Sequence, residues 1–212
     1  MCIAGLINAL KITGRTAGDC RAVVLGAGAA GIAIARFLVD FGLEDVVLCD
    51  SHGAITPDRA DGMNPWKKKV AEVTNPKRVT GTLADVMVGR DLFIGVSRPN
   101  LVTKAMVASM ATDSIVFALA NPVSEISAED ARAAGAAVAL DGRGMNNALA
   151  YPGIFRGTLD ARARRITHAM KFAAATTLAE AADGGSLLPE MTDMAVHQRV
   201  AAAVRAAADA GT

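Results

Sequence analysis

The residues with the clearest chemical meaning form a glycine-rich segment at positions 26–31, which has the spacing GxGxxG. A short apolar run precedes this segment, and residues with helical periodicity follow it. In that context the first glycine permits a tight turn, the second lets a pyrophosphate approach the backbone, and the third lets the helix pack closely on the strand. The helix N-terminus adds N–H donors and a partial positive charge. The segment therefore predicts a phosphate-binding turn made by Gly26, Gly28, Ala29, Ala30 and Gly31.

An acidic residue, Asp50, ends the next apolar run, 19 residues after Gly31. A carboxylate at this position can accept hydrogen bonds from the hydroxyls of an adenosine ribose. Because it would also repel a 2′-phosphate, it favours NAD over NADP. Nearby basic residues could instead wrap such a phosphate, although a solvated charged face is the simpler interpretation; they are Arg59, Lys67, Lys68 and Lys69. The alternative to a dinucleotide site is a glycine-rich turn without a ligand, with Asp50 as a helix cap.

Polar residues also follow two later apolar runs. Ser97 comes directly after one of them and Asn121 two residues after the other, and in open α/β sheets ligands bind outside the carboxyl ends of strands. Asn121 could hydrogen-bond a carboxamide or a substrate hydroxyl, although an Asn-Pro pair also simply makes a turn. The pair Asn146 and Asn147 has the same two interpretations, as ligand contacts or as a helix cap.

The rest of the chain must supply the elements that position these residues. Five apolar runs, at 21–25, 46–49, 92–96, 115–119 and 137–140, alternate with segments of helical periodicity. This alternation predicts an α/β fold with a Rossmann-like, doubly wound parallel sheet. Two long Ala-rich helices, at about 160–182 and 193–210, are expected to end the chain. Since neither a repeat nor a low-complexity linker interrupts it, we interpret residues 1–212 as a single domain.

Composition excludes several classes of protein. The chain has 212 residues, of which 52% are hydrophobic, so intrinsic disorder is excluded. Its 22 basic and 21 acidic residues leave a net charge of +1, which would gather neither nucleic acid nor an anionic membrane. The longest apolar stretch, at 23–35, contains three glycines and is shorter than the ~20 residues of a membrane span. Three cysteines without disulfide or zinc spacing fit a reducing, cytoplasmic location.

Seven segments of the chain resemble the NAD-binding domain of malic enzymes in their short bacterial form. In family order these segments are 4–11, 23–35, 50–55, 64–76, 92–100, 116–126 and 146–163, and they cover nearly the whole chain. The combination of ALANP, GVS and NNALAYPGIFRG is the most specific part, because a generic Rossmann dehydrogenase would not show it.

The resemblance implies an enzyme that oxidises malate at its 2-hydroxyl with NAD, or less favourably NADP, and releases CO2 to leave pyruvate. It places the dinucleotide on the 26–31 loop and Asp50, and Ser97 along the ribose and nicotinamide. Asn121 and one residue of the pair Asn146 and Asn147 would reach the nicotinamide and the malate. In the family a divalent metal, Mg²⁺ or Mn²⁺, holds the oxygen atoms of the substrate during loss of CO2.

The resemblance also implies that part of the catalytic machinery lies outside this chain. The i, i+3, i+4, i+7 spacing of apolar residues at positions 3–10 predicts an amphipathic helix that opens the chain. The family's catalytic Tyr and Lys and its metal-holding acids precede this helix, so we expect no catalytic residue and no metal ligand here, and Tyr151 is not a substitute. The chain alone should then be inactive. Its expected partners are a missing N-terminal catalytic domain or a second copy, which would cover exposed apolar residues of the opening helix; these are Ile3, Leu6, Ile7 and Leu10.

Two other functions remain compatible with the residues themselves. One is a non-catalytic Rossmann module that senses a dinucleotide or serves as an interaction partner. The other is a different two-domain dehydrogenase acting on a hydroxy or amino acid, which the ALANP and PGIFRG segments disfavour.

The chain departs from the family pattern in one loop, because the loop between Arg143 and Asn146 is shorter than usual.

Overall fold

The computed structural model describes residues 1–210, which fall into two compact units. Residues 13–144 form one unit, which we call the sheet unit. Residues 1–12 and the described residues from 145 onward form the other, which we call the helical unit. The sequence predicted a single domain over residues 1–212, and the division into two compact units leaves this a prediction.

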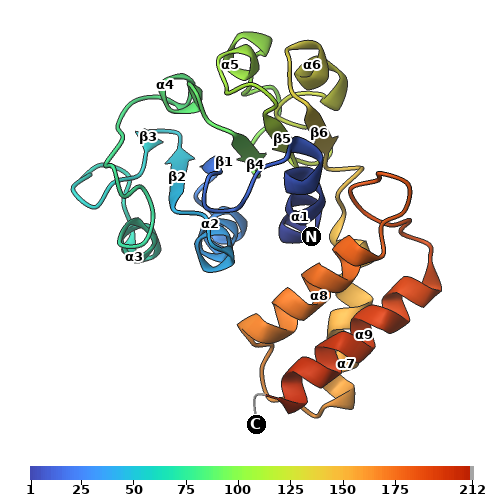
Figure 1. Cartoon of the computed structure of the whole chain (residues 1–212). Helices are drawn as coiled ribbons and strands as arrows, with labels where there is room; N and C mark the ends of the chain where they lie inside the picture. Colours follow the sequence, from blue (N-terminus) through green and yellow to red (C-terminus); the bar gives the residue numbers. More distant parts are fainter. Residues whose placement is uncertain (211–212) are drawn as a thin grey trace. The chain divides into compact units, whose positions relative to one another are not determined.

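The sheet unit is built on a six-stranded sheet in the order β3-β2-β1-β4-β5-β6 (Figure 1). The strands are β1 (Arg21–Leu25), β2 (Asp45–Asp50), β3 (Gly53–Ala54), β4 (Leu92–Gly95), β5 (Ile115–Ala118) and β6 (Val138–Asp141). All neighbours are parallel except β2 and β3. This order confirms the expected doubly wound Rossmann-like fold. The sequence did not predict β3, because a strand of two residues is too short to show alternation.

The core of this unit follows the register of the strands. Val23 of β1 lies opposite Val47 and Phe93, and Phe93 lies opposite Val116. All four are buried, and each such side chain removed from water contributes about 1.5–3 kcal/mol. They pack in one cluster with residues of α4 (Leu83–Met87), α5 (Lys104–Ala108) and α6 (Ala128–Ala133). In Figure 1, α2 (Ala29–Phe41) and α3 (Pro65–Ala71) lie on the opposite side of the sheet.

Local signals in the sequence set the end of α2 and the start of α3. Helix α2 ends at Gly42, whose φ of 108° lets its N–H reach the carbonyls of Leu38 and Val39. Helix α3 begins after Asn64, whose side-chain oxygen accepts a hydrogen bond from the Lys67 N–H at 2.9 Å. This cap fixes the start of the helix that carries Lys67.

The helical unit departs from the expected helix boundaries. It contains α1 (Cys2–Thr13, whose last residue belongs to the sheet unit), the 3₁₀ turn η1 (Asn147–Leu149), α7 (Tyr151–Asp160), α8 (His168–Glu180) and α9 (Met194–Asp209). The prediction of one helix over 160–182 is wrong. Arg162 adopts a φ of 51°, which a helix does not tolerate, and Thr167 then caps a new helix.

The sequence did not predict helix α7, because the segment contains a proline and two glycines. Pro152 stands in the first turn, where its missing N–H costs nothing. Gly153 and Gly157 bring α7 close to α9, because a Cβ at either would lie 2.6 Å from Val200 Cγ1 or 2.4 Å from the Ala201 carbonyl oxygen. These glycines therefore serve helix packing and do not end the helix.

Helix α1 does not expose the apolar face that the sequence suggested. Ile3, Leu6 and Leu10 are 2%, 0% and 6% exposed, and Ile7 is half-buried, so the expectation of an open face is wrong. The Asn8 side-chain amide donates to the carbonyls of Ala179 at 2.8 Å and Leu187 at 3.1 Å. Among residues 1–210, no helix is long and apolar enough to cross a membrane.

Candidate functional site

A cleft of about 1250 Å³ lies at the carboxyl ends of β1, β2 and β4 in the sheet unit. Its lining includes Gly26 after β1, Asp50 at the end of β2, and Ser97 after β4. Strand order reverses between β1 and β4, and such a reversal is where dinucleotides bind in open α/β sheets. The fold thus brings three of the residues predicted from sequence to one cleft.

The three glycines of the 26–31 loop have different surroundings. A Cβ on Gly26 would lie 2.6 Å from the Val96 carbonyl oxygen, and its φ is 111°. A Cβ on Gly31 would lie 1.6 Å from the Gly26 carbonyl oxygen. A Cβ on Gly28, in contrast, would have no atom of the described chain within 4 Å. Packing within the protein therefore requires Gly26 and Gly31, whereas Gly28 faces open space, as a backbone that receives a ligand would.

The first turn of α2 extends this open surface. Ala29 and Ala30 are exposed there, and Gly28 precedes the helix without a side-chain cap on its N–H groups. The free N–H groups and the helix dipole at this end favour an anion.

Two cations hold the Asp50 carboxylate. Arg59 donates through Nη1 to Oδ1 at 2.9 Å and through Nη2 to Oδ2, and Lys67 Nζ donates to Oδ2 at 2.7 Å. The backbone N–H of His52 also donates to Oδ1, at 2.8 Å. Burial alone would raise the pKa of Asp50, but the hydrogen bonds from Arg59 and Lys67 outweigh it and hold this pKa well below its ordinary value. Asp50 is therefore ionised at neutral pH.

The basic residues near Asp50 divide into two groups. The side chains of Arg59 and Lys67 are only 13% and 15% exposed, so a solvated face is the wrong interpretation for these two. Lys68 and Lys69 are exposed, as expected. The sequence did not predict the hydrogen bonds of these two residues with Asp50, because Arg59 lies in an irregular loop and Lys67 lies in α3.

The polar residues after β4 and β5 are both exposed at the carboxyl end of the sheet. The Ser97 backbone N–H donates to Glu125 Oε1 at 2.8 Å, and the Asn121 amide donates weakly to the Leu119 carbonyl at 3.3 Å. The side chain of Asn121 also lies against Gly142, where a Cβ would come within 2.9 Å of Nδ2. Among these residues Ser97 lines the cleft, and sequence reasoning gave Glu125 no role.

Asn146 and Asn147 belong to the helical unit, where both are exposed. The Asn146 side-chain oxygen accepts a hydrogen bond from the Ala148 N–H at 2.9 Å and caps η1. The capping interpretation therefore describes Asn146, and contact of either residue with a ligand stays a prediction.

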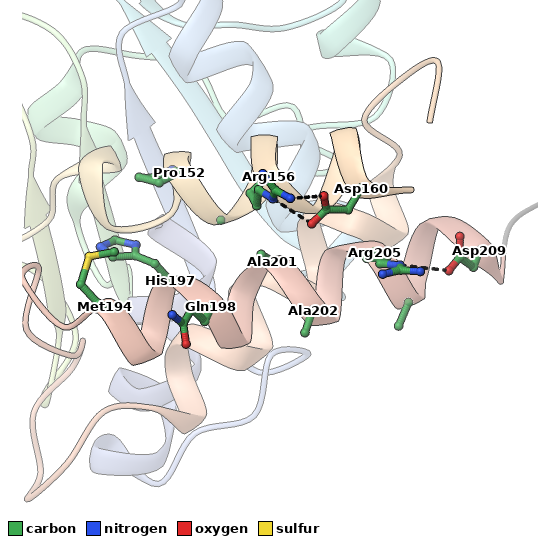
Figure 2. A pocket seen from close by; sticks show the side chains of 12 residues that line it. Pro152, Arg156, Asp160, Met194, His197, Gln198, Ala201, Ala202, Arg205 and Asp209 are labelled. Carbon is green, nitrogen blue, oxygen red and sulfur yellow. Dashed lines mark hydrogen bonds and ion pairs between the residues drawn. The ribbon is translucent and has the colours of Figure 1, made fainter. Parts of the chain in front are cut away.

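A second cavity, of about 580 Å³, lies between α7 and α9 in the helical unit (Figure 2). Its charged side chains already pair along their own helices, Arg156 with Asp160 and Arg205 with Asp209. Alanines and Pro152 form much of the remaining wall. This groove offers neither a glycine loop nor a free charge for a dinucleotide, so the cleft of the sheet unit is the better candidate.

Other reactive groups contribute little to the candidate chemistry. Burial raises the pKa of the Cys20 and Cys49 thiols to about 12, so neither is a ready nucleophile. Within residues 1–210, no three His, Cys, Asp or Glu side chains come together as a group that could hold a metal ion.

Comparison with known proteins identifies the family. The family described as "Malic enzyme, NAD binding domain" matches residues 1–145 and 135–209. This chain belongs to the malic enzyme family. It is 49% identical over 97% of its length to the bifunctional malic/malolactic enzyme of Bacillus subtilis, of which it covers 53%. It is 42% identical over 97% of its length to the NAD-dependent malic enzyme of Geobacillus stearothermophilus, of which it covers 45%.

Solved structures agree with this assignment. The crystal structure of the NAD-dependent malic enzyme of Thermotoga maritima superposes with a TM-score of 0.92 at 38% identity, over 96% of this chain and 56% of that one. The part of a malic enzyme that this chain represents is therefore the NAD-binding domain, and it spans about half the length of the relatives named here.

Proposed function

We propose that this chain binds NAD as part of an enzyme that converts malate to pyruvate and CO2. The observation that carries the proposal is the difference among the loop glycines. Internal packing requires Gly26 and Gly31, but nothing in the described chain occupies the space beside Gly28. A pyrophosphate that approaches this backbone would be met by the N-terminal N–H groups of α2. Bound NAD would accept the hydride released from the 2-carbon of malate.

Each of the other predicted residues would contact a different part of the dinucleotide or the substrate. Asp50 would accept hydrogen bonds from the adenosine ribose on the β2 side. Ser97 would lie along the ribose and nicotinamide on the β4 side, and Asn121 would orient the carboxamide or the substrate. Asn146 and Asn147 would contribute to the malate site.

The choice between NAD and NADP depends on the balance of charge at Asp50. Relatives of this chain carry both names, NAD-dependent and NADP-dependent. We infer a preference for NAD, because the Asp50 carboxylate lies where a ribose would bind. Arg59 and Lys67 offset its charge, so the preference is expected to be small.

Turnover of malate would need groups beyond the NAD-binding domain. We propose that the general acid and base, and the Mg²⁺ or Mn²⁺ ligands, come from an N-terminal catalytic domain of the kind that the resemblance implies. That domain or a second copy of this chain would be its partner in a cytoplasmic enzyme. A non-catalytic sensor is the alternative, and the family assignment favours the enzyme.

Three measurements on the purified chain test the proposal. Trp66, the only tryptophan, precedes Lys67, so binding of NADH should quench its fluorescence by energy transfer. Calorimetry should show saturable binding of NAD, and its absence at millimolar concentration would refute the cofactor site.

Reduction of NAD with malate and Mn²⁺ should be undetectable for the chain alone and appear when an N-terminal malic enzyme domain is added. Turnover by the chain alone would place the catalytic groups within these residues.

A further inference from the structure

A buried carboxylate connects the loops that follow β4 and β5. Glu125 is 0% exposed. Its Oε1 accepts a hydrogen bond from the Ser97 N–H at 2.8 Å, and its Oε2 accepts one from the Ala120 N–H at 3.1 Å. One side chain thus holds both Ser97, two residues after β4, and Ala120, the residue before Asn121.

The backbone around Glu125 strengthens this connection. The Asn100 N–H donates to the Ser124 carbonyl, and the Val102 N–H donates to the Glu125 carbonyl, both at 3.1 Å. These bonds run the 97–102 segment alongside the 121–125 segment. The two loops therefore form one connected layer at the carboxyl end of the sheet.

The chain also makes room for this carboxylate. A Cβ at Gly95 would lie 2.4 Å from the Glu125 carboxyl carbon, so any larger residue in β4 would displace it. Within residues 1–210 no Lys, Arg or His nitrogen lies within ion-pair distance of Glu125. Burying a carboxylate without a cation is costly unless hydrogen bonds satisfy it. The two N–H groups of the loops provide those bonds.

We propose that Glu125 is a positioning residue that sets the nicotinamide half of the dinucleotide site. The proposal rests on the proposed function, because it concerns the same cleft. Strands β4 and β5 lie on the opposite side of β1 from β2, which carries Asp50. A dinucleotide that extends across this point has its adenosine at β2 and its other half over β4 and β5. Glu125 touches neither half and acts through the backbone of Ser97 and Ala120.

The test compares two ligands and four proteins. NADH carries both halves of the dinucleotide, whereas ADP-ribose lacks the nicotinamide ring. Glu125→Gln replaces one acceptor oxygen by an N–H donor that faces another donor. We expect NADH affinity to fall about tenfold, while ADP-ribose affinity changes less than twofold. Gly95→Ala should give the same pattern, because its Cβ would come within 2.4 Å of the Glu125 carboxyl carbon and displace the carboxyl group. Glu129→Gln, an exposed carboxylate on α6, is the matched control and should change neither affinity.

The outcomes separate this proposal from the proposed function. A wild-type chain that binds neither ligand refutes the dinucleotide site itself. A wild-type chain that binds both equally, or a Glu125→Gln chain that keeps the wild-type difference, overturns only the role of Glu125. Equal loss of both ligands also overturns it, since that would indicate a general structural role.

Hydrogen exchange on the wild-type chain covers the case in which a variant fails to fold. The amides of Ser97 and Ala120 should be protected, and their protection should rise further with NADH than with ADP-ribose. Unprotected amides, or equal protection by the two ligands, would overturn the proposal.

Discussion

Arg59 and Asp50 meet through both of their forked ends at the carboxyl end of β2. Nη1 lies 2.9 Å from Oδ1, and Nη2 donates to Oδ2. Lys67 reaches the same Oδ2 at 2.7 Å, so one carboxylate is shared by two cations. The ribose hydroxyls of NAD would compete with Arg59 and Lys67 for Asp50, whereas a 2′-phosphate would compete with Asp50 for the cations.

Removal of the carboxylate should therefore relax the choice of cofactor. Asp50→Ala loses its charge-assisted hydrogen bonding to the ribose, and a loss equal to one such bond, about 1.5–3 kcal/mol, lowers NAD affinity roughly ten- to a hundredfold. NADP should lose less or bind better, because Arg59 and Lys67 become free for its phosphate. Calorimetric titration with both cofactors measures the ratio. A larger loss for NADP than for NAD would contradict the role given to Asp50.

Removal of the cation should have the opposite effect. In Arg59→Ala, the Asp50 carboxylate keeps only Lys67 as a cation partner and is more available to the ribose, while a 2′-phosphate loses its bidentate partner. The ratio of NAD to NADP affinity should rise, by roughly tenfold for one charge-assisted bond. Lys68→Ala removes an exposed charge next to Lys67 and should leave the ratio unchanged. If both variants shift it alike, long-range charge and not the contact sets the preference.

Substitution of Gly28 should abolish binding without cost to the fold. The Cβ of a valine there would have no atom of the described chain within 4 Å, so the free energy of unfolding should stay within about 0.5 kcal/mol of wild type, as for ordinary surface changes. The branched side chain would occupy the space that the pyrophosphate needs. Gly18→Val, at an exposed turn with equally open surroundings, should preserve NAD binding. Equal NAD affinity of the Gly28→Val and wild-type chains would remove the site from this loop.

The third glycine should behave in the reverse way. Gly31→Ala places a Cβ 1.6 Å from the Gly26 carbonyl oxygen, a contact that only a backbone shift can relieve. We expect the free energy of unfolding to fall by about 1–3 kcal/mol or more, as overpacked cores do. Urea denaturation measures this loss directly. A stable Gly31→Ala chain would show that the close packing of α2 on β1 is adjustable.

The sequence predicted those parts of the fold that depend on local patterns. β1 occupies the residues expected of it, because an apolar run that ends in glycine is a local signal. Gly42 ends α2 as expected for the same reason. α7 was missed because its glycines serve contacts with α9, a partner far along the chain, and a glycine that packs looks the same in sequence as one that breaks a helix.

The site shows the same division between local and distant causes. The loop glycines and Asp50 carry a spacing that can be read directly, and the fold brings Gly26 and Asp50 to one cleft. The contacts of Arg59 and Glu125 depend on loops without periodicity. Glu125 looks like any acidic residue in a loop, and only its two N–H partners, 28 and 5 residues away, give it a role.

Acid should weaken the fold through Asp50. Its folded pKa lies below the unfolded value of about 3.9, so its contribution to stability is complete above that pH and is lost as pH falls toward the folded pKa. Asp50→Asn should therefore be less stable than wild type at pH 7, by about 1 kcal/mol for a solvent-screened ion pair, and the difference should shrink below pH 4. Urea midpoints at pH 7, 5 and 3 test this. Asp61→Asn, an exposed acid of the same loop, should show no such convergence.

An exposed apolar row on α7 should mediate association of the chain. Tyr151, Phe155 and Leu159 follow one another at four-residue spacing and are 61%, 43% and 71% exposed. The rings of Tyr151 and Phe155 contact each other with centroids 4.5 Å apart, and Leu159 follows one helical turn later. Contiguous exposed apolar side chains of this kind usually mark an interface. Helix α7, and not α1, thus carries the exposed apolar row that this prediction concerns.

Leu159→Glu tests this surface by placing a charge at the most exposed residue of the row. Burial of one leucine contributes about 1.5–3 kcal/mol, so sedimentation velocity should show association weakened roughly ten- to a hundredfold. Val88→Glu is the matched control, because Val88 is 63% exposed but lies outside the row. Wild-type chain that is monomeric at all concentrations would exclude a second copy as the partner. An N-terminal malic enzyme domain that binds the wild-type chain but not the Leu159→Glu chain would then identify the occupant, whereas equal binding to both would show that α7 is not the interface.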